Sequence, residues 1–275
     1  MAKRLEGVLS PVITPFKKDL SPDHDRFVKH CKWLLRSGCS GLAVFGTNSE
    51  ANSMAVEEKL ELLDALIKGG VPADALMPGT GHCALTDSVK MTREAVRMGC
   101  AGVLMLPPFY YKGVPDEGLF RNFAEVVERV GDDRLRLYLY HIPPVANVPI
   151  TLELIDRLIT RYPGIVVGAK DSSGDWSNTK AVLDRFKDRG FDVFPGSEVF
   201  LLDGLRAGGK GCITATRSIV QKVPMIPALK AITAHFGNDP AWKTVRPPLV
   251  ELSDAHEKQV ITELKSAGFS MPGLA

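Results

Sequence analysis

The sequence lacks several features that would point to whole classes of protein. Its five cysteines are scattered and form no CxxC pair, and this odd number is typical of reduced thiols in a cytoplasm rather than of a disulfide framework. No run of about 20 apolar residues is present, so we expect no membrane span. The net charge is only +2, which argues against nucleic acid or an anionic membrane as the partner. We therefore expect a cytoplasmic protein.

Sequence signals for the common cofactors are also missing. No GxGxxG motif follows the first expected strand, which weakens the case for a dinucleotide-binding fold. The histidines, cysteines and carboxylates show no spacing that resembles a zinc site. We expect neither a metal nor an organic cofactor.

What the sequence does contain is a repeated alternation of a short apolar strand, a polar turn and an amphipathic helix. Because strands that alternate with helices pair in parallel, the pattern predicts a parallel sheet. Eight such units are the number found in a closed (β/α)8 TIM barrel, and an open doubly wound sheet is the alternative. The expected strands are 7–14, 41–45, 76–79, 102–106, 135–140, 164–170, 191–194 and 211–215.

The chain is expected to divide into a barrel and a helical extension. Residues 1–220 would form the catalytic barrel, and residues 221–275 contain no further strand and would add about three helices packed on it. The first barrel helix is expected to start at Pro22, with Ser21 as its N-cap.

Lys170 ends an apolar strand, after the β-branched residues Ile165, Val166 and Val167. A lysine at the end of a buried strand is partly desolvated, and a neutral amine is a nucleophile that forms a Schiff base with a carbonyl compound. Most strand-end lysines simply reach solvent, so this observation needs support from the rest of the chain.

The ends of the other strands supply that support, because the active site of a barrel lies at the C-terminal ends of its strands. Tyr140 ends the strand next to that of Lys170, and its hydroxyl could carry a proton, although a buried core tyrosine is the alternative. The turn Gly46-Thr47-Asn48-Ser49-Glu50 opens a helix and could hold a carboxylate, or could be an ordinary helix cap.

Five motifs in register resemble the dihydrodipicolinate synthase/N-acetylneuraminate lyase family of class I, Schiff-base-forming aldolases. They are GTNSE at 46–50, PPFYY at 107–111, YHIPP at 140–144, GAKDSSGD at 168–175 and PGSE at 195–198. The resemblance covers the whole chain and implies a (β/α)8 barrel with a C-terminal helical extension.

The resemblance also implies a role for individual residues. Lys170 would form the Schiff base with pyruvate or another 2-oxo acid, Tyr140 would transfer protons, and Thr47 would relay them. Tyr110 matches a tyrosine that reaches into the neighbouring subunit's site in many members, which are typically homotetramers built as dimers of dimers. The remaining substrate-binding positions would be Thr47 and Asn48 for the carboxylate, and Gly196 and Ile213 around the pyruvate.

The sequence departs from the family pattern where the second substrate would bind. Dihydrodipicolinate synthases have an arginine five residues after the catalytic tyrosine, and here that position is Val145. The sialic-acid branch has an acidic pair after the glycine of the seventh strand, of which only Glu198 remains. Arg217 is a candidate anchor for an anionic substrate, with a surface salt bridge as its alternative role.

Together these features predict a lyase that reversibly cleaves a 2-keto-3-deoxy sugar acid or 4-hydroxy-2-oxo acid to pyruvate and an aldehyde. Dehydration through the same imine is a close alternative, and Val145 disfavours a true dihydrodipicolinate synthase. A non-catalytic 2-oxo-acid sensor and a pyridoxal phosphate enzyme are the alternatives from other classes.

Overall fold

The computed structural model describes residues 4–214 and 223–274. The described residues form two compact units. The first unit consists of residues 4–10, 40–43 and 72–214, and the second of residues 11–39, 44–71 and 223–274. The expected division into a barrel of residues 1–220 and an extension of residues 221–275 stays a prediction.

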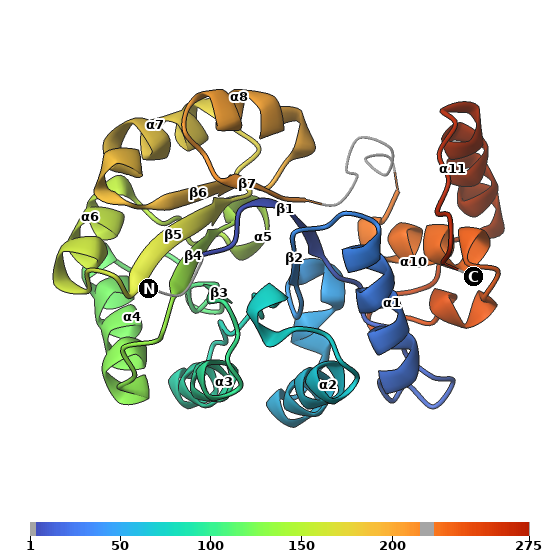
Figure 1. The fold of residues 1–275 in the computed structure, drawn as a ribbon, viewed down its shortest axis with the longest axis horizontal. Coiled ribbons are helices and arrows are strands. Elements are labelled where there is room, and N and C mark those ends of the chain that lie inside the picture. Colours follow the sequence, from blue (N-terminus) through green and yellow to red (C-terminus); the bar gives the residue numbers. More distant parts are fainter. Residues whose placement is uncertain (1–3, 215–222, 275) are drawn as a thin grey trace. The chain divides into compact units, whose positions relative to one another are not determined.

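The first unit contains two short parallel sheets (Figure 1). One has the order β2–β1–β7 and the other β3–β4–β5–β6, and the β1–β7, β3–β4, β4–β5 and β5–β6 pairs are parallel. The strands are β1 (Gly7–Pro11), β2 (Gly41–Ala43), β3 (Val103–Met105), β4 (Leu137–His141), β5 (Val166–Asp171), β6 (Asp192–Pro195) and β7 (Gly211–Ile213).

Hydrogen bonds join the two sheets at both edges. On one side, residues 76–79 bridge them, because Leu76 pairs with Leu42 of β2 and Gly79 pairs with Leu104 of β3. On the other side, the Lys210 N–H, just before β7, donates to the Val193 carbonyl of β6 at 3.0 Å. In the described part of the chain, eight parallel segments therefore close into a ring, which confirms the predicted (β/α)8 barrel.

The third predicted strand is present only as those two isolated bridges. Pro78 lies between the paired residues and has no N–H to donate, so a continuous ladder cannot form there. The Pro78 carbonyl still accepts from Leu104 N at 2.9 Å, which keeps the segment in place.

Helices follow the strands of the first unit, and Figure 1 shows α4, α6 and α7 outside the strands. Thr151 caps α6, since its hydroxyl accepts from Leu154 N at 3.0 Å. The helices are α3 (Leu85–Arg97), α4 (Asp116–Val130), α5 (Pro143–Ala146), α6 (Leu152–Arg161), α7 (Trp176–Phe186) and α8 (Leu201–Arg206), with 3-10 turns at η3 (Ala73–Ala75), η4 (Lys187–Arg189) and η5 (Glu198–Phe200).

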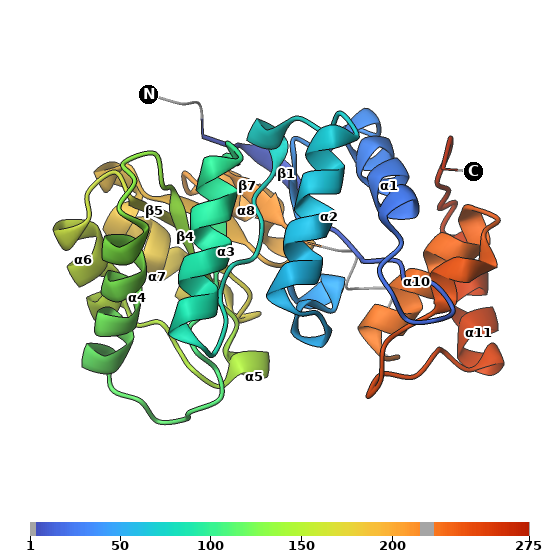
Figure 2. The same ribbon diagram turned by 90° about the horizontal axis from the view of Figure 1, so that it is seen from below.

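The second unit is helical in its described part. Figure 2 shows α10 and α11 side by side, and buried Ala228, Ile232 and Val260 belong to their common apolar core. The elements are α1 (His24–Arg36), η1 (Thr47–Ser49), η2 (Ala51–Ser53), α2 (Val56–Lys68), α10 (Met225–Phe236), η6 (Pro240–Lys243) and α11 (Asp254–Ser266). Among the described residues, no helix is long and apolar enough to cross a membrane.

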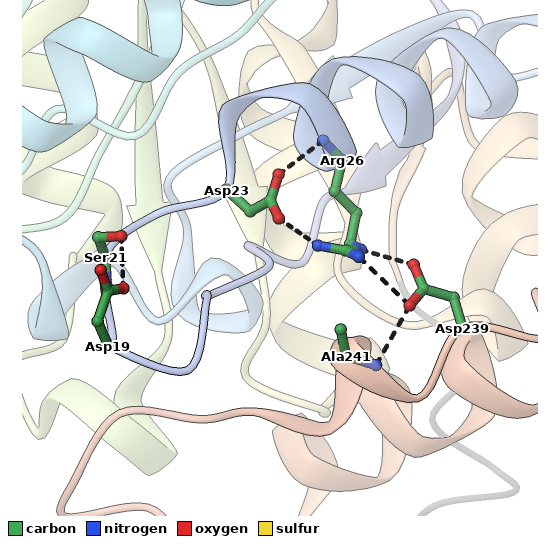
Figure 3. A network of polar contacts seen from close by, with 6 residues as sticks. All are labelled: Asp19, Ser21, Asp23, Arg26, Asp239 and Ala241. Atoms are coloured by element: carbon green, nitrogen blue, oxygen red, sulfur yellow. Dashed lines mark hydrogen bonds and ion pairs between the residues drawn. The ribbon is translucent and has the colours of Figure 1, made fainter.

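The start of α1 differs from the prediction. Asp23, not Ser21, is the N-cap, and its carboxylate accepts from Arg26 N at 3.0 Å (Figure 3). Pro22 is paired with Phe16 in an isolated antiparallel bridge, so the chain is still extended where the helix was expected to begin. The Ser21 hydroxyl instead donates to Asp19 at 2.7 Å.

Candidate active site

Lys170 lies near the C-terminal end of β5, at the position that the sequence predicted. Every residue of β5 is buried, because neighbouring strands flank it on both sides, and Lys170 itself is only 6% exposed. The register pairs Lys170 with Tyr140 of β4 and with Phe194 of β6. An amine is therefore held inside the C-terminal end of the barrel, where it has little freedom to reach solvent.

Tyr140 faces that amine directly. The Lys170 Nζ lies 3.1 Å from the Tyr140 hydroxyl and 4.2 Å from the centre of its ring. Tyr140 is 3% exposed and belongs to the barrel core together with Phe194 and Ile213. The contact places a group that can donate and accept a proton within hydrogen-bond reach of an amine nitrogen.

Tyr138 points to the same face of β4 as Tyr140, one layer deeper, because side chains alternate along a strand. Its hydroxyl lies 3.1 Å from Asp192 Oδ2 at the start of β6. Gly168 of β5 makes room for its ring, since a Cβ on Gly168 would lie 2.6 Å from the Tyr138 ring. Burial raises the pKa of Tyr138 and also that of Asp192.

The turn after β5 is rigid because Asp171 is satisfied by several donors. Its carboxylate accepts from Thr179 Oγ1 at 2.6 Å, from Asn178 Nδ2 at 3.0 Å and from Ser173 N at 2.9 Å. Asp171 directly follows Lys170 and is 4% exposed. This network fixes the end of the strand that carries the amine.

Gly196 lies in close contact with this turn. Its N–H donates to the Asp171 carbonyl at 2.6 Å, and a Cβ at this position would lie 2.0 Å from Ser172 Oγ. Only glycine permits so close an approach between the ends of β5 and β6. Ile213 at the end of β7 is fully buried and packs in the same core as Tyr140.

Glu198 stands at the same end of the barrel, in η5 after β6. Its Oε2 accepts from the hydroxyl of Thr214, which follows β7, at 2.8 Å. A carboxylate is therefore fixed between the ends of two neighbouring strands. Such a group accepts hydrogen bonds from substrate hydroxyls and repels anions.

Thr47 and Asn48 belong to the second unit, where they form η1. Asn48 is 7% exposed and Ser49 is fully buried, with the Ser49 hydroxyl donating to the Val12 carbonyl. The turn is thus well ordered by contacts within its own unit.

Tyr110 and Val145 are exposed on the first unit, and Arg217 lies outside the described residues. Tyr110 is 73% exposed, and its ring meets that of Tyr111 edge-on, with 5.4 Å between ring centres. Val145 lies on α5 and is 59% exposed. In the described ranges, no three His, Cys, Asp or Glu side chains gather in a way that could hold a metal ion.

The chain matches the model of the dihydrodipicolinate synthetase family over residues 4–233. The chain belongs to this family. It is 34% identical over 220 residues to an uncharacterised DapA-like lyase of Chloroflexus aurantiacus, which spans 79% of this chain and 72% of the relative. It is 30% identical over 215 residues to a 4-hydroxy-tetrahydrodipicolinate synthase of Desulforamulus reducens, with 78% and 71% covered.

A crystal structure of dihydrodipicolinate synthase from Agrobacterium tumefaciens is also similar. Its TM-score is 0.89 at 30% identity, with 94% of this chain and 98% of that chain covered. Membership of the dihydrodipicolinate synthetase family and these relatives support a lyase as the class of enzyme.

Several residues that support this family site were not predicted from the sequence. One is Asp171, whose carboxylate organises the turn after β5. Its position directly after Lys170 in the sequence is the feature that could have indicated this role. Thr214 was not expected to hold Glu198, because residues 16 positions apart give no local pattern. Lys112 was missed as well, and its Nζ donates to the Ala146 carbonyl at 2.8 Å, which ties the loop after β3 to α5.

Proposed function

We propose that this member of the family is a class I lyase that forms a Schiff base between Lys170 and a 2-oxo acid. The observation that carries the proposal is the 3.1 Å contact between the Lys170 amine and the Tyr140 hydroxyl inside the buried end of the barrel. A non-catalytic 2-oxo-acid sensor would gain nothing from a nucleophile placed beside a proton-transfer group.

The proposed reaction begins when Lys170 Nζ attacks the C2 carbonyl of the substrate. The carbinolamine loses water, with Tyr140 transferring the proton, and leaves a protonated imine. The proton of the C4 hydroxyl is then removed by Tyr140, the C3–C4 bond breaks, and its electrons move into the imine to give an enamine. The aldehyde leaves, C3 is protonated, and water hydrolyses the imine to release pyruvate.

The roles of the other site residues follow from the family resemblance. Thr47 and Tyr110 would pass protons to and from Tyr140, and Thr47 with Asn48 would bind the carboxylate of the 2-oxo acid. Gly196 and Ile213 would line the pyruvate. The exposed pair of Tyr110 and Tyr111 supports assembly with a second copy, and we propose the family's homotetramer. The chemistry requires neither a metal nor an organic cofactor.

We propose a 2-keto-3-deoxy sugar acid or a 4-hydroxy-2-oxo acid as the substrate. Val145 supplies no positive charge where dihydrodipicolinate synthases have an arginine, so an anionic aldehyde has no partner there. The Glu198 carboxylate at the barrel end favours a partner rich in hydroxyl groups. Dehydration of the same class of acid is the second candidate, because it uses the same imine.

Reduction with borohydride in the presence of pyruvate tests the proposal. The wild-type protein should gain a reduced pyruvyl group on Lys170, located by peptide mass spectrometry, and Lys170→Ala should gain none. A wild-type protein that forms no adduct at saturating pyruvate would contradict the proposal. An adduct without turnover of any acid in a panel of 2-oxo acids would favour the sensor instead.

A further inference from the structure

The turn that contains Thr47 and Asn48 has an unusual backbone. η1 (Thr47–Ser49) and η2 (Ala51–Ser53) are consecutive 3-10 turns, and Glu50 joins them in the left-handed conformation, with φ at 54°. A residue with a Cβ adopts this conformation only when its surroundings hold it there. The contacts of the Glu50 side chain can therefore hold the turn in this conformation.

The carboxylate of Glu50 is completely buried and forms an ion pair with Lys230 of α10, whose side chain is also 0% exposed. Its other oxygen accepts from Arg246 N at 3.0 Å. The Lys230 Nζ also donates to the Thr244 carbonyl at 2.7 Å and lies 4.4 Å from the centre of the Phe16 ring. All of these residues belong to the second unit.

Burying the ion pair of Lys230 and Glu50 carries a desolvation cost, so the pair is not explained by stability alone. Burial lowers the pKa of Lys230, and the Glu50 carboxylate opposes that change by favouring the charged amine. Well-packed apolar residues stabilise a core as well as a buried ion pair does, so such a pair is weak evidence for stability alone. A buried pair does specify one arrangement of the chain, because moving either partner leaves an unpaired charge.

We propose that Lys230 and Glu50 are positioning residues, and that their ion pair holds the Thr47–Ser49 turn in the form that binds the carboxylate of the 2-oxo acid. The inference rests on the proposed function, in which this turn is the carboxylate site. It gives the C-terminal helices a task in substrate binding, since α10 supplies the amine. Loss of the carboxylate contact raises KM. Release of the turn also lowers kcat, because the turn carries Thr47, the proposed proton relay.

The test measures the pyruvate concentration that gives half-maximal borohydride trapping on Lys170. In Glu50→Gln and in Lys230→Met we expect this concentration to rise about tenfold or more, with full trapping at saturation and a lower kcat on the best substrate of the panel, because the released turn also carries Thr47. A matched control is Arg26→Gln. Arg26 forms an ion pair with Asp239, Nε to Oδ2 at 2.6 Å, and so also ties the N-terminal part of the unit to its C-terminal part (Figure 3). Its loss should leave the half-maximal concentration unchanged.

The double variant Glu50→Gln/Lys230→Met separates positioning from folding. Removing both charges relieves the unpaired charge that each single variant leaves, so the urea midpoint should return toward that of the wild type. The half-maximal pyruvate concentration should stay raised, because the turn is still released. Recovery of both quantities would overturn the inference, as would unchanged pyruvate binding in all three variants. If the wild-type protein itself forms no adduct, the proposed function fails first.

Discussion

Tyr138 and Tyr140 offer a test of the site with its control on the same strand. Both are buried tyrosines on one face of β4, and each hydroxyl contacts an ionisable side chain. Tyr140 reaches the Lys170 amine at 3.1 Å, whereas Tyr138 reaches Asp192 Oδ2 at 3.1 Å. Each Tyr→Phe substitution removes one phenolic hydroxyl group. A difference between the two variants must therefore come from what each hydroxyl contacts.

Tyr140→Phe should mainly lower activity, whereas Tyr138→Phe should mainly lower stability. Tyr140→Phe removes the proton-transfer group and should lower kcat by about 100- to 10,000-fold, the usual contribution of general acid–base catalysis. Tyr138→Phe leaves the carboxyl group of Asp192, which is 2% exposed, without one of its donors. We expect a loss of about 1–3 kcal/mol in the free energy of unfolding, with a kcat within a few-fold of the wild type.

Pyruvate release from the best substrate of the panel gives kcat, and urea unfolding gives stability. Borohydride trapping should still label Lys170 in both variants at saturating pyruvate and long incubation, because each keeps its nucleophile. A folded Tyr140→Phe variant with undiminished kcat would refute the assignment of Tyr140. Equal losses of kcat in the two folded variants would show that the contact of Tyr140 with Lys170 has no catalytic role beyond that of any buried tyrosine hydroxyl on β4.

Three further predictions follow from single sites. Burial between Trp33 and Trp242 lowers the pKa of His30 to about 4. The unfolded chain therefore binds a proton more readily than the folded chain, and stability is lost as the pH falls from about 6.5 toward 4. Urea unfolding at pH 5 should show a free energy of unfolding about 2 kcal/mol lower than at pH 7.5, and His30→Gln should not show this loss. Val145→Arg should raise kcat/KM for anionic aldehydes in the condensation direction about tenfold or more, and no gain would remove the support for that departure from the family pattern. Gly196→Ala should cost about 1–3 kcal/mol in urea unfolding and weaken pyruvate trapping, and Ser172→Ala should restore only part of the loss, because the Cβ and Cα atoms of residue 172 would remain 2.9 Å from the new methyl group.

The order of strands and helices could be predicted because each depends on a local pattern. The apolar run before Lys170 forms β5, close to the predicted strand 164–170. Local patterns failed where a contact made elsewhere decided the outcome. Ser21 and Asp23 both fit an N-cap, and only the pairing of Pro22 with Phe16 shows that the chain is still extended at residue 22.

Some contacts of the candidate site could also be predicted from local patterns, and others could not. Lys170 and Tyr140 end consecutive strands, so pairing of those strands was enough to predict that they meet. The pairs Glu198–Thr214 and Glu50–Lys230 join residues from different elements, and Glu50 and Lys230 are 180 positions apart in the sequence. No periodicity links such residues, since each contact depends on where the folded chain returns.

Two of the three buried lysines in the described part of the chain, Lys170 and Lys230, show why the partner, and not burial alone, indicates the chemistry. Lys170 ends an apolar strand and Lys230 lies within the apolar helix α10, and both are almost or fully buried in the folded chain. Burial lowers the pKa of Lys230, but the carboxylate of Glu50 opposes this change and favours the charged ammonium. An ammonium has no lone pair with which to attack a carbonyl. Lys170 contacts a phenol hydroxyl, which is a neutral group that can donate and accept a proton. A lysine in an apolar segment is therefore a candidate nucleophile only when no carboxylate is paired with it, and that distinction requires the fold.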